Sequence, residues 1–127
     1  MVLIFTGQPS GKIEIQGPKE KVQTNDFITS APIQQENFVV LYYDSNFAIQ
    51  FDKTTSAFQI TFNSADRQQL KELRPVSEEI LLNILGIKQS DACKLYVVER
   101  IQQSPALTLN NYIYGLSFCG QSDKFAE

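Results

Sequence analysis

Two cysteines in the last third of the chain constrain its fold most, because each lies at one end of an apolar, strand-like run. Cys93 begins the run that continues to Val98, and Cys119 ends the run that starts at Tyr112. If the runs pair as antiparallel strands with Cys93 opposite Cys119, residues 102–110 form the connecting loop. Both cysteines then fall on one face, so we predict a Cys93–Cys119 disulfide. Two ordinary buried thiols in a cytosolic protein are the alternative.

The composition is that of one globular domain. The chain has 127 residues, of which 43% are hydrophobic and 20% charged, and its formal net charge is −3. This length is enough to bury a core, so we take residues 1–127 as a single α+β domain. The basic residues are spread along the sequence, which disfavours nucleic acid and anionic membrane as partners.

The residue types argue against an enzyme. The sequence contains no histidine, which excludes Ser-His-Asp and Cys-His catalysis and histidine metal sites. The two cysteines are too far apart for a CxxC redox motif and too few for a zinc site. The adjacent Glu78 and Glu79 point in different directions on a helix, so they do not converge on one proton or metal ion. Their expected position in the first helical turn, where the helix dipole favours negative charge, explains why they are there. We therefore expect no catalytic, cofactor-binding or metal-binding residues.

The middle of the chain predicts a β-meander. Residues 38–43 are continuously β-prone, and phenylalanine and isoleucine then alternate with small or polar residues through residues 47–51 and 58–62. This pattern places four phenylalanines on one face, where we expect them to form the core: Phe47, Phe51, Phe58 and Phe62.

Helices are expected next. Ser64 caps a first helix that ends at Pro75, because proline lacks an N–H and disfavours helical geometry in the residue before it. Ser77 caps a second helix that ends at Gly86. The predicted fold is α+β, an antiparallel sheet with two helices packed on one face and a C-terminal β pair closed by a disulfide.

Three tyrosines form a candidate interaction surface. Tyr112 and Tyr114 share a face of the last predicted strand, and Tyr96 lies on the strand expected to pair with it. Tyrosines on a solvated sheet face are common at interfaces, and they are equally common as half-buried strand residues. The sequence leaves both interpretations open.

The C-terminal region resembles a pattern in short uncharacterised proteins of ultra-small bacteria, the candidate phyla radiation (Patescibacteria). The resemblance covers about the last 40 residues and rests on Leu-Gly-Ile at 85–87, Ala-Cys-Lys-Leu-Tyr-Val at 92–97 and Gly-Leu-Ser-Phe-Cys at 115–119. It implies a hydrophobic anchor helix followed by a small exported domain in which Cys93 and Cys119 pair. Residues 1–5 are apolar but far too short to span a bilayer, so the resemblance implies an anchor that this sequence does not contain.

We expect a non-catalytic domain of the cell envelope, located outside the cytoplasm. Its expected partner is a protein or a cell-surface ligand, and no cofactor is expected. The alternative is a cytosolic acidic adaptor or inhibitor, of the immunity or anti-defence type, because small size and negative charge fit that class as well.

Overall fold

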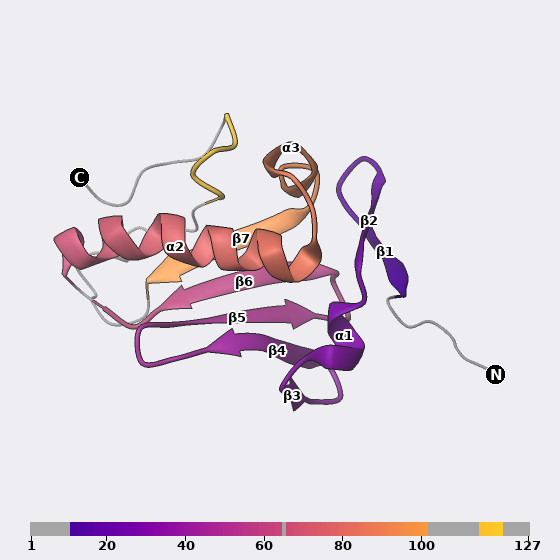
Figure 1. Cartoon of the computed structure of the whole chain (residues 1–127), viewed down its shortest axis with the longest axis horizontal. Coiled ribbons are helices and arrows are strands. Elements are labelled where there is room, and N and C mark those ends of the chain that lie inside the picture. Colours follow the sequence, from indigo (N-terminus) through magenta and orange to yellow (C-terminus); the bar gives the residue numbers. More distant parts are fainter. Residues whose placement is uncertain (1–10, 65, 102–114, 121–127) are drawn as a thin grey trace.

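A five-stranded sheet forms the centre of the fold (Figure 1). The computed structural model describes residues 11–64, 66–101 and 115–120. In spatial order the strands are β3 (Ile33–Gln34), β4 (Phe38–Tyr43), β5 (Phe47–Asp52), β6 (Ala57–Phe62) and β7 (Tyr96–Ile101). Neighbouring strands are antiparallel except β6 and β7, which are parallel. The predicted α+β class is confirmed, and the sheet is mixed because a helical crossover joins β6 to β7.

The predicted meander is β4, β5 and β6. Four aromatic side chains share one face of β5 and β6 and are buried, as the alternation predicted: Phe47, Phe51, Phe58 and Phe62. Phe27, from the short helix α1 (Phe27–Ser30), packs on this cluster. Its ring centroid lies 4.9 Å from that of Phe51, in an edge-on arrangement, and 5.3 Å from that of Phe58. These rings form the part of the core that α1 covers.

A β-bulge in β4 separates two adjacent tyrosines. The register of β4 against β5 shifts between Val40 and Tyr42, which leaves Leu41 as the extra residue. Tyr42 therefore turns to the core face, where its ring stacks on that of Phe47 at 5.3 Å. Tyr43 turns to the opposite face and is exposed.

One long helix, α2 (Arg67–Leu85), covers the core face of the sheet (Figure 1). Its N-cap is Asp66, whose carboxylate accepts hydrogen bonds from the backbone N–H groups of Gln68 and Gln69. Its C-cap is Gly86, in the left-handed conformation with φ 67°, as the sequence predicted.

The predicted break at Pro75 is wrong, because α2 continues through this residue. Pro75 is exposed, so water can reach the side of the helix where a hydrogen bond is missing. Leu70 before the proline and Leu81 after it are both fully buried. Packing on either side thus holds one helix where the local sequence favours two. Ser77 is not a cap, and its hydroxyl donates to the Arg74 carbonyl inside the helix.

A separate two-stranded hairpin precedes the main sheet, made of β1 (Lys12–Gln16) and β2 (Lys21–Asn25). The Asn25 side chain donates to the Ile84 carbonyl over 3.3 Å, near the C-terminal end of α2. A Cβ atom at Gly17 would collide with the Lys94 carbonyl, so only glycine allows this approach. The hairpin therefore packs against the region between α2 and β7.

Candidate functional site

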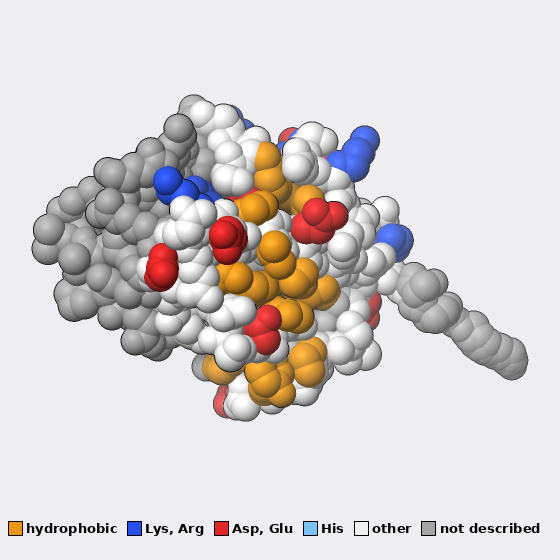
Figure 2. Space-filling view, turned by 60° about the vertical axis from the view of Figure 1, so that its left-hand side comes forward, with side chains coloured by type: hydrophobic (Ala, Val, Ile, Leu, Met, Phe, Trp, Pro, Cys, Tyr) orange, Lys and Arg blue, Asp and Glu red, His pale blue; other side chains and the backbone are white. Residues whose placement is uncertain are grey.

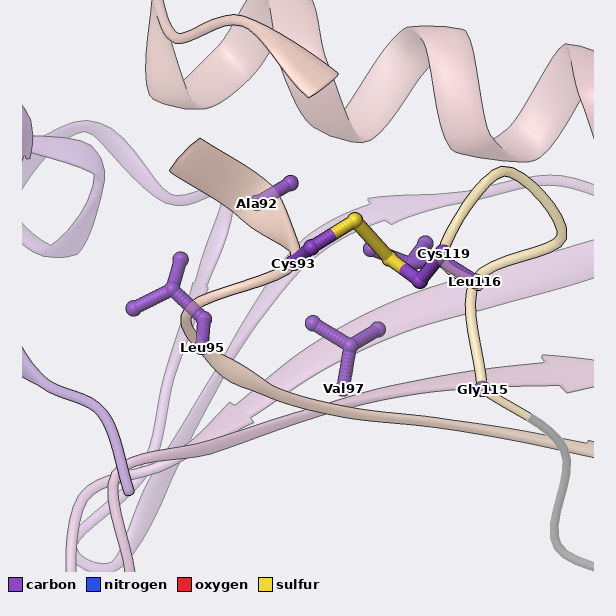
Figure 3. Close-up of a pocket in the computed structure, with 7 residues that line it drawn as sticks. All are labelled: Ala92, Cys93, Leu95, Val97, Gly115, Leu116 and Cys119. Carbon is purple, nitrogen blue, oxygen red and sulfur yellow. A yellow bond between two sulfur atoms is a disulfide. The ribbon is translucent and has the colours of Figure 1, made fainter. Parts of the chain in front are cut away.

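Cys93 and Cys119 form a disulfide, as predicted, with their Cα atoms 5.6 Å apart (Figure 3). Cys93 caps the C-terminal end of the short helix α3 (Gln89–Ala92). Cys119 belongs to residues 115–120, which we call the C-terminal strap. The disulfide thus fastens the strap to the connection between α2 and β7.

The strap differs from the predicted C-terminal β pair. Residues 115–120 form turns and irregular backbone, and the Cys119 N–H donates to the Leu116 carbonyl. β7 begins only at Tyr96, because the Cys93 N–H donates to the Gln89 carbonyl and ends α3. Local helical hydrogen bonds therefore keep the first residues of the run that begins at Cys93 out of the strand, although this run is β-prone. Tyr112 and Tyr114 lie outside the described residues.

An apolar pocket of about 190 Å³ lies between the strap and the start of β7. Figure 3 shows Val97 below the disulfide and Leu116 beside Cys119, with Ala92 and Leu95 on the side of α3. The side chains that line the pocket are apolar or belong to the disulfide itself. Such a lining accepts a hydrophobic group and offers no charged side chain to orient a polar one.

A buried charge cluster connects α2, β7 and the strap. Arg74 of α2 donates from Nε to Glu99 Oε1 of β7 over 2.7 Å, and from Nη2 to the Gly115 carbonyl over 2.7 Å. Its Nε also lies 3.6 Å from Glu78 Oε2, one turn further along α2. One guanidinium therefore serves two carboxylates and one end of the strap.

Glu78 holds the middle of the strap. Its Oε2 accepts the Ser117 backbone N–H over 2.7 Å, and its Oε1 accepts the Ser117 hydroxyl over 2.6 Å. Together with Arg74 and the disulfide, Glu78 gives the strap three kinds of attachment. Leu116, between the two polar contacts, is buried against the core.

Burial raises the pKa of Glu99 from its ordinary value near 4.5 to about 10. This value includes a further increase caused by the neighbouring Glu78 side chain and a decrease caused by Arg74. Within the described part of the chain, Glu99 Oε2 has no hydrogen-bond partner. Because the causes that raise the pKa of Glu99 outweigh the effect of Arg74, we assign a proton to Glu99 at neutral pH.

The cluster was missed in the sequence, where Glu78 was interpreted as a first-turn residue. It lies in the middle of α2, and its side chain is 3% exposed. Glu99 is fully buried as well. One signal was available: Glu99 has the same parity in β7 as Val97 and Ile101, so it points inward. The arrangement suits a clamp on the strap better than acid–base chemistry.

The face of the sheet opposite α2, which we call the distal face, consists of three rows that cross β4, β5, β6 and β7. In each row, neighbouring residues are partners in the strand register. The first row is Phe38, Asp52, Ala57 and Tyr96. The second row is Val40, Gln50, Gln59 and Val98. The third row is Tyr43, Ala48, Thr61 and Arg100. Every one of these residues is half-buried or exposed, whereas their core-facing neighbours are mostly buried.

Three aromatic side chains stand out on the distal face. Tyr43 is 58% exposed, Tyr96 46% and Phe38 37%. Tyr96 is thus placed on a solvated surface, as one of the two sequence interpretations required. A depression of about 290 Å³ lies beside Phe38, with Asp52 and Ala57 among the residues that line it. The distal face therefore has both bulky and hollow areas, which suits an opposing surface.

Figure 2 shows a second apolar area: on the face in view, hydrophobic side chains gather at the centre with acidic side chains around them. Along α2, apolar residues that are half-buried or exposed recur at helical spacing: Leu73, Val76, Ile80 and Ile84. An apolar area with an acidic border disfavours acidic partners.

Comparisons with known proteins add no assignment. No protein-family model matches the chain, and neither a curated protein nor a solved structure shows significant similarity to it. The resemblance of residues 84–119 to exported proteins of candidate phyla radiation bacteria therefore stays a prediction. In residues 11–64, 66–101 and 115–120, no three His, Cys, Asp or Glu side chains gather as metal ligands. No helix in these ranges is long and apolar enough to cross a membrane.

Proposed function

We propose that this chain is a non-catalytic binding domain that works outside the cytoplasm, at the cell envelope. Its partner is a protein or a ligand on a cell surface, and the distal face is the surface that binds it. The observation that carries this proposal is the Cys93–Cys119 disulfide.

The disulfide supports the location because such bonds persist in oxidising compartments and are rare in the reducing cytosol. Cys93 is exposed, so a cytosolic reductant would have access to the bond. The bond fastens a strap that has no strand or helix of its own in residues 115–120. A strap of this kind gains more from a covalent attachment than a regular element would.

The binding role is supported by the distribution of exposed aromatic side chains. Of the four large hydrophobic residues that the described structure exposes most, three lie on the distal face: Phe38, Tyr43 and Tyr96. Tyrosine and phenylalanine are enriched at protein interfaces because they bury a large area with few rotatable bonds. The buried carboxylates have a structural explanation in the strap, which leaves the surface as the best candidate for function.

The test is the redox state of the protein as its own cell makes it. Protein isolated without reductant is alkylated under denaturing conditions, and its intact mass is measured before and after reduction. The proposal expects no alkylation before reduction and two alkylated cysteines after it. A matched sample expressed in a reducing cytosol provides the two-thiol reference. Two free thiols in the native protein would overturn the proposal and favour the cytosolic adaptor or inhibitor instead.

A further inference from the structure

We propose that the partner of the distal face is a second copy of this chain, so that the domain forms a symmetric dimer through sheet-on-sheet packing. This inference deepens the proposed function and rests on its binding surface. The inference follows from the order of residue types in the three rows, because two identical distal faces packed against each other bring favourable residue pairs together.

Two sheets that pack face to face lie about 10 Å apart, and a two-fold axis between them makes the contact isologous. That axis can run along the rows or along the strands. If it runs along the rows, the first and third rows exchange places on each strand. If it runs along the strands, each row faces itself with β4 over β7 and β5 over β6.

For both axes, residues of the second row face residues of the same type in the second copy. With the axis along the rows, Val98 faces Val98 and Gln59 faces Gln59 of the second copy. With the axis along the strands, Val98 faces Val40 and Gln59 faces Gln50. Valine therefore always meets valine, and glutamine always meets glutamine, whose amide can both donate and accept a hydrogen bond.

For both axes, the residues at the ends of the first and third rows also face favourable partners. Phe38 faces a tyrosine in either case, Tyr43 with the axis along the rows and Tyr96 with the axis along the strands. Arg100 likewise always faces a tyrosine, Tyr96 or Tyr43 respectively. An arginine over a tyrosine ring is a favourable cation–π pair. Arg100 is exposed and makes no ion pair within the described residues, so its guanidinium is available for this contact.

The charges do not oppose the contact. Asp52 and Arg100 are the two charged members of the distal face, and they carry opposite charges. Asp52 faces an alanine of the second copy for either axis, Ala48 or Ala57, so no two carboxylates meet. The apolar area in Figure 2 is different, because its acidic border would bring like charges together in a symmetric dimer.

The experiment is analytical ultracentrifugation of the full oxidised chain over a concentration series. Tyr96→Lys and Phe38→Lys each place a cation in the interface, and Val76→Lys is the matched control on α2, where Val76 is 51% exposed. We expect a dimer for the wild type, with a dissociation constant weakened at least about tenfold by either distal-face variant and unchanged by the control. Circular dichroism checks that all variants are folded.

A wild type that stays monomeric up to about 1 mM would overturn the dimer, as would a dimer that the control weakens as much as the distal-face variants. The same samples are assayed for free thiols. A monomer with bridged cysteines sinks the dimer alone and leaves the envelope proposal standing, whereas free thiols remove the envelope proposal whatever the oligomeric state.

Discussion

Arg74 reaches across two layers of the fold to Glu99: its Nε lies 2.7 Å from Glu99 Oε1, although the residues are 25 positions apart in the sequence. The same guanidinium holds the Gly115 carbonyl, so a helix, a strand and the C-terminal strap meet at one side chain. Arg74 thus gives polar partners to two buried acidic side chains, Glu78 and Glu99, whose burial would otherwise be costly.

Replacing Arg74 tests the clamp directly. Arg74→Met keeps much of the side-chain volume but leaves Glu78 without its ion-pair partner and Glu99 without its hydrogen-bond donor, so we expect a loss of about 3–5 kcal/mol in the free energy of unfolding. Lys71→Met, at an exposed position of α2, is the control and should change stability by less than about 0.5 kcal/mol. Urea denaturation measures both, and equal stability of the two variants would contradict the clamp.

Stability should fall with rising pH because of Glu99. The folded protein holds this proton up to about pH 10, whereas an unfolded chain releases it near pH 4.5. Between these values the folded state binds more protons, so the free energy of unfolding decreases as pH increases. Glu99→Gln removes this dependence and keeps an oxygen for Arg74.

Denaturation curves at about pH 5, 7 and 9 provide the measurement. The Gln variant should gain stability relative to the wild type at each step upward, while Glu79→Gln, at the exposed neighbour of Glu78, should follow the wild type. Parallel curves for the wild type and Glu99→Gln would show that Glu99 is already ionised in the folded protein.

Pro75→Ala distinguishes one helix from two. In a continuous α2 the substitution restores a backbone hydrogen bond, so we expect stability to rise by about 1–3 kcal/mol. Pro32→Ala, outside the helices, is the control and should give no such gain. If Pro75 instead separated two helices, its replacement would leave stability unchanged or lower.

Removing the disulfide should weaken the fold without abolishing it. The bond closes a separation of 26 residues, so the chain-entropy estimate for the Cys93→Ser, Cys119→Ser double variant is a loss of about 3–4 kcal/mol. Chemical reduction of the wild type should cause a loss of similar size. An unchanged denaturation midpoint would mean that Arg74 and Glu78 hold the strap unaided.

Local sequence signals predicted most of the core and the end of α2. The alternating phenylalanines fixed the inward face of β5 and β6, because strand parity depends only on neighbouring residues. Gly86 marked the helix end for an equally local reason, its positive φ. The Cys93–Cys119 pairing was also predicted correctly, although the strand pairing behind that prediction differs from the structure.

The errors arose where distant residues decide local structure. Pro75 stays within one helix because Leu70 and Leu81 pack in the core. This tertiary packing cannot be predicted from the residues that surround Pro75 in the sequence. The parallel pairing of β7 with β6 depends on the crossover through α2. Arg74, Glu78 and Glu99 were not grouped because charged residues in a helix and a strand normally face solvent, and only the third dimension brings them together.

The extra residue at Leu41 places two adjacent tyrosines on opposite faces of the sheet. Tyr42 packs on the core face, where its ring stacks on Phe47, and Tyr43 is exposed on the opposite face. Moving that single insertion along β4 would exchange these roles while the amino-acid content of the strand stayed the same. Strand register therefore decides in part which side chains the outer surface exposes, and a comparison of amino-acid composition alone would not detect such a change.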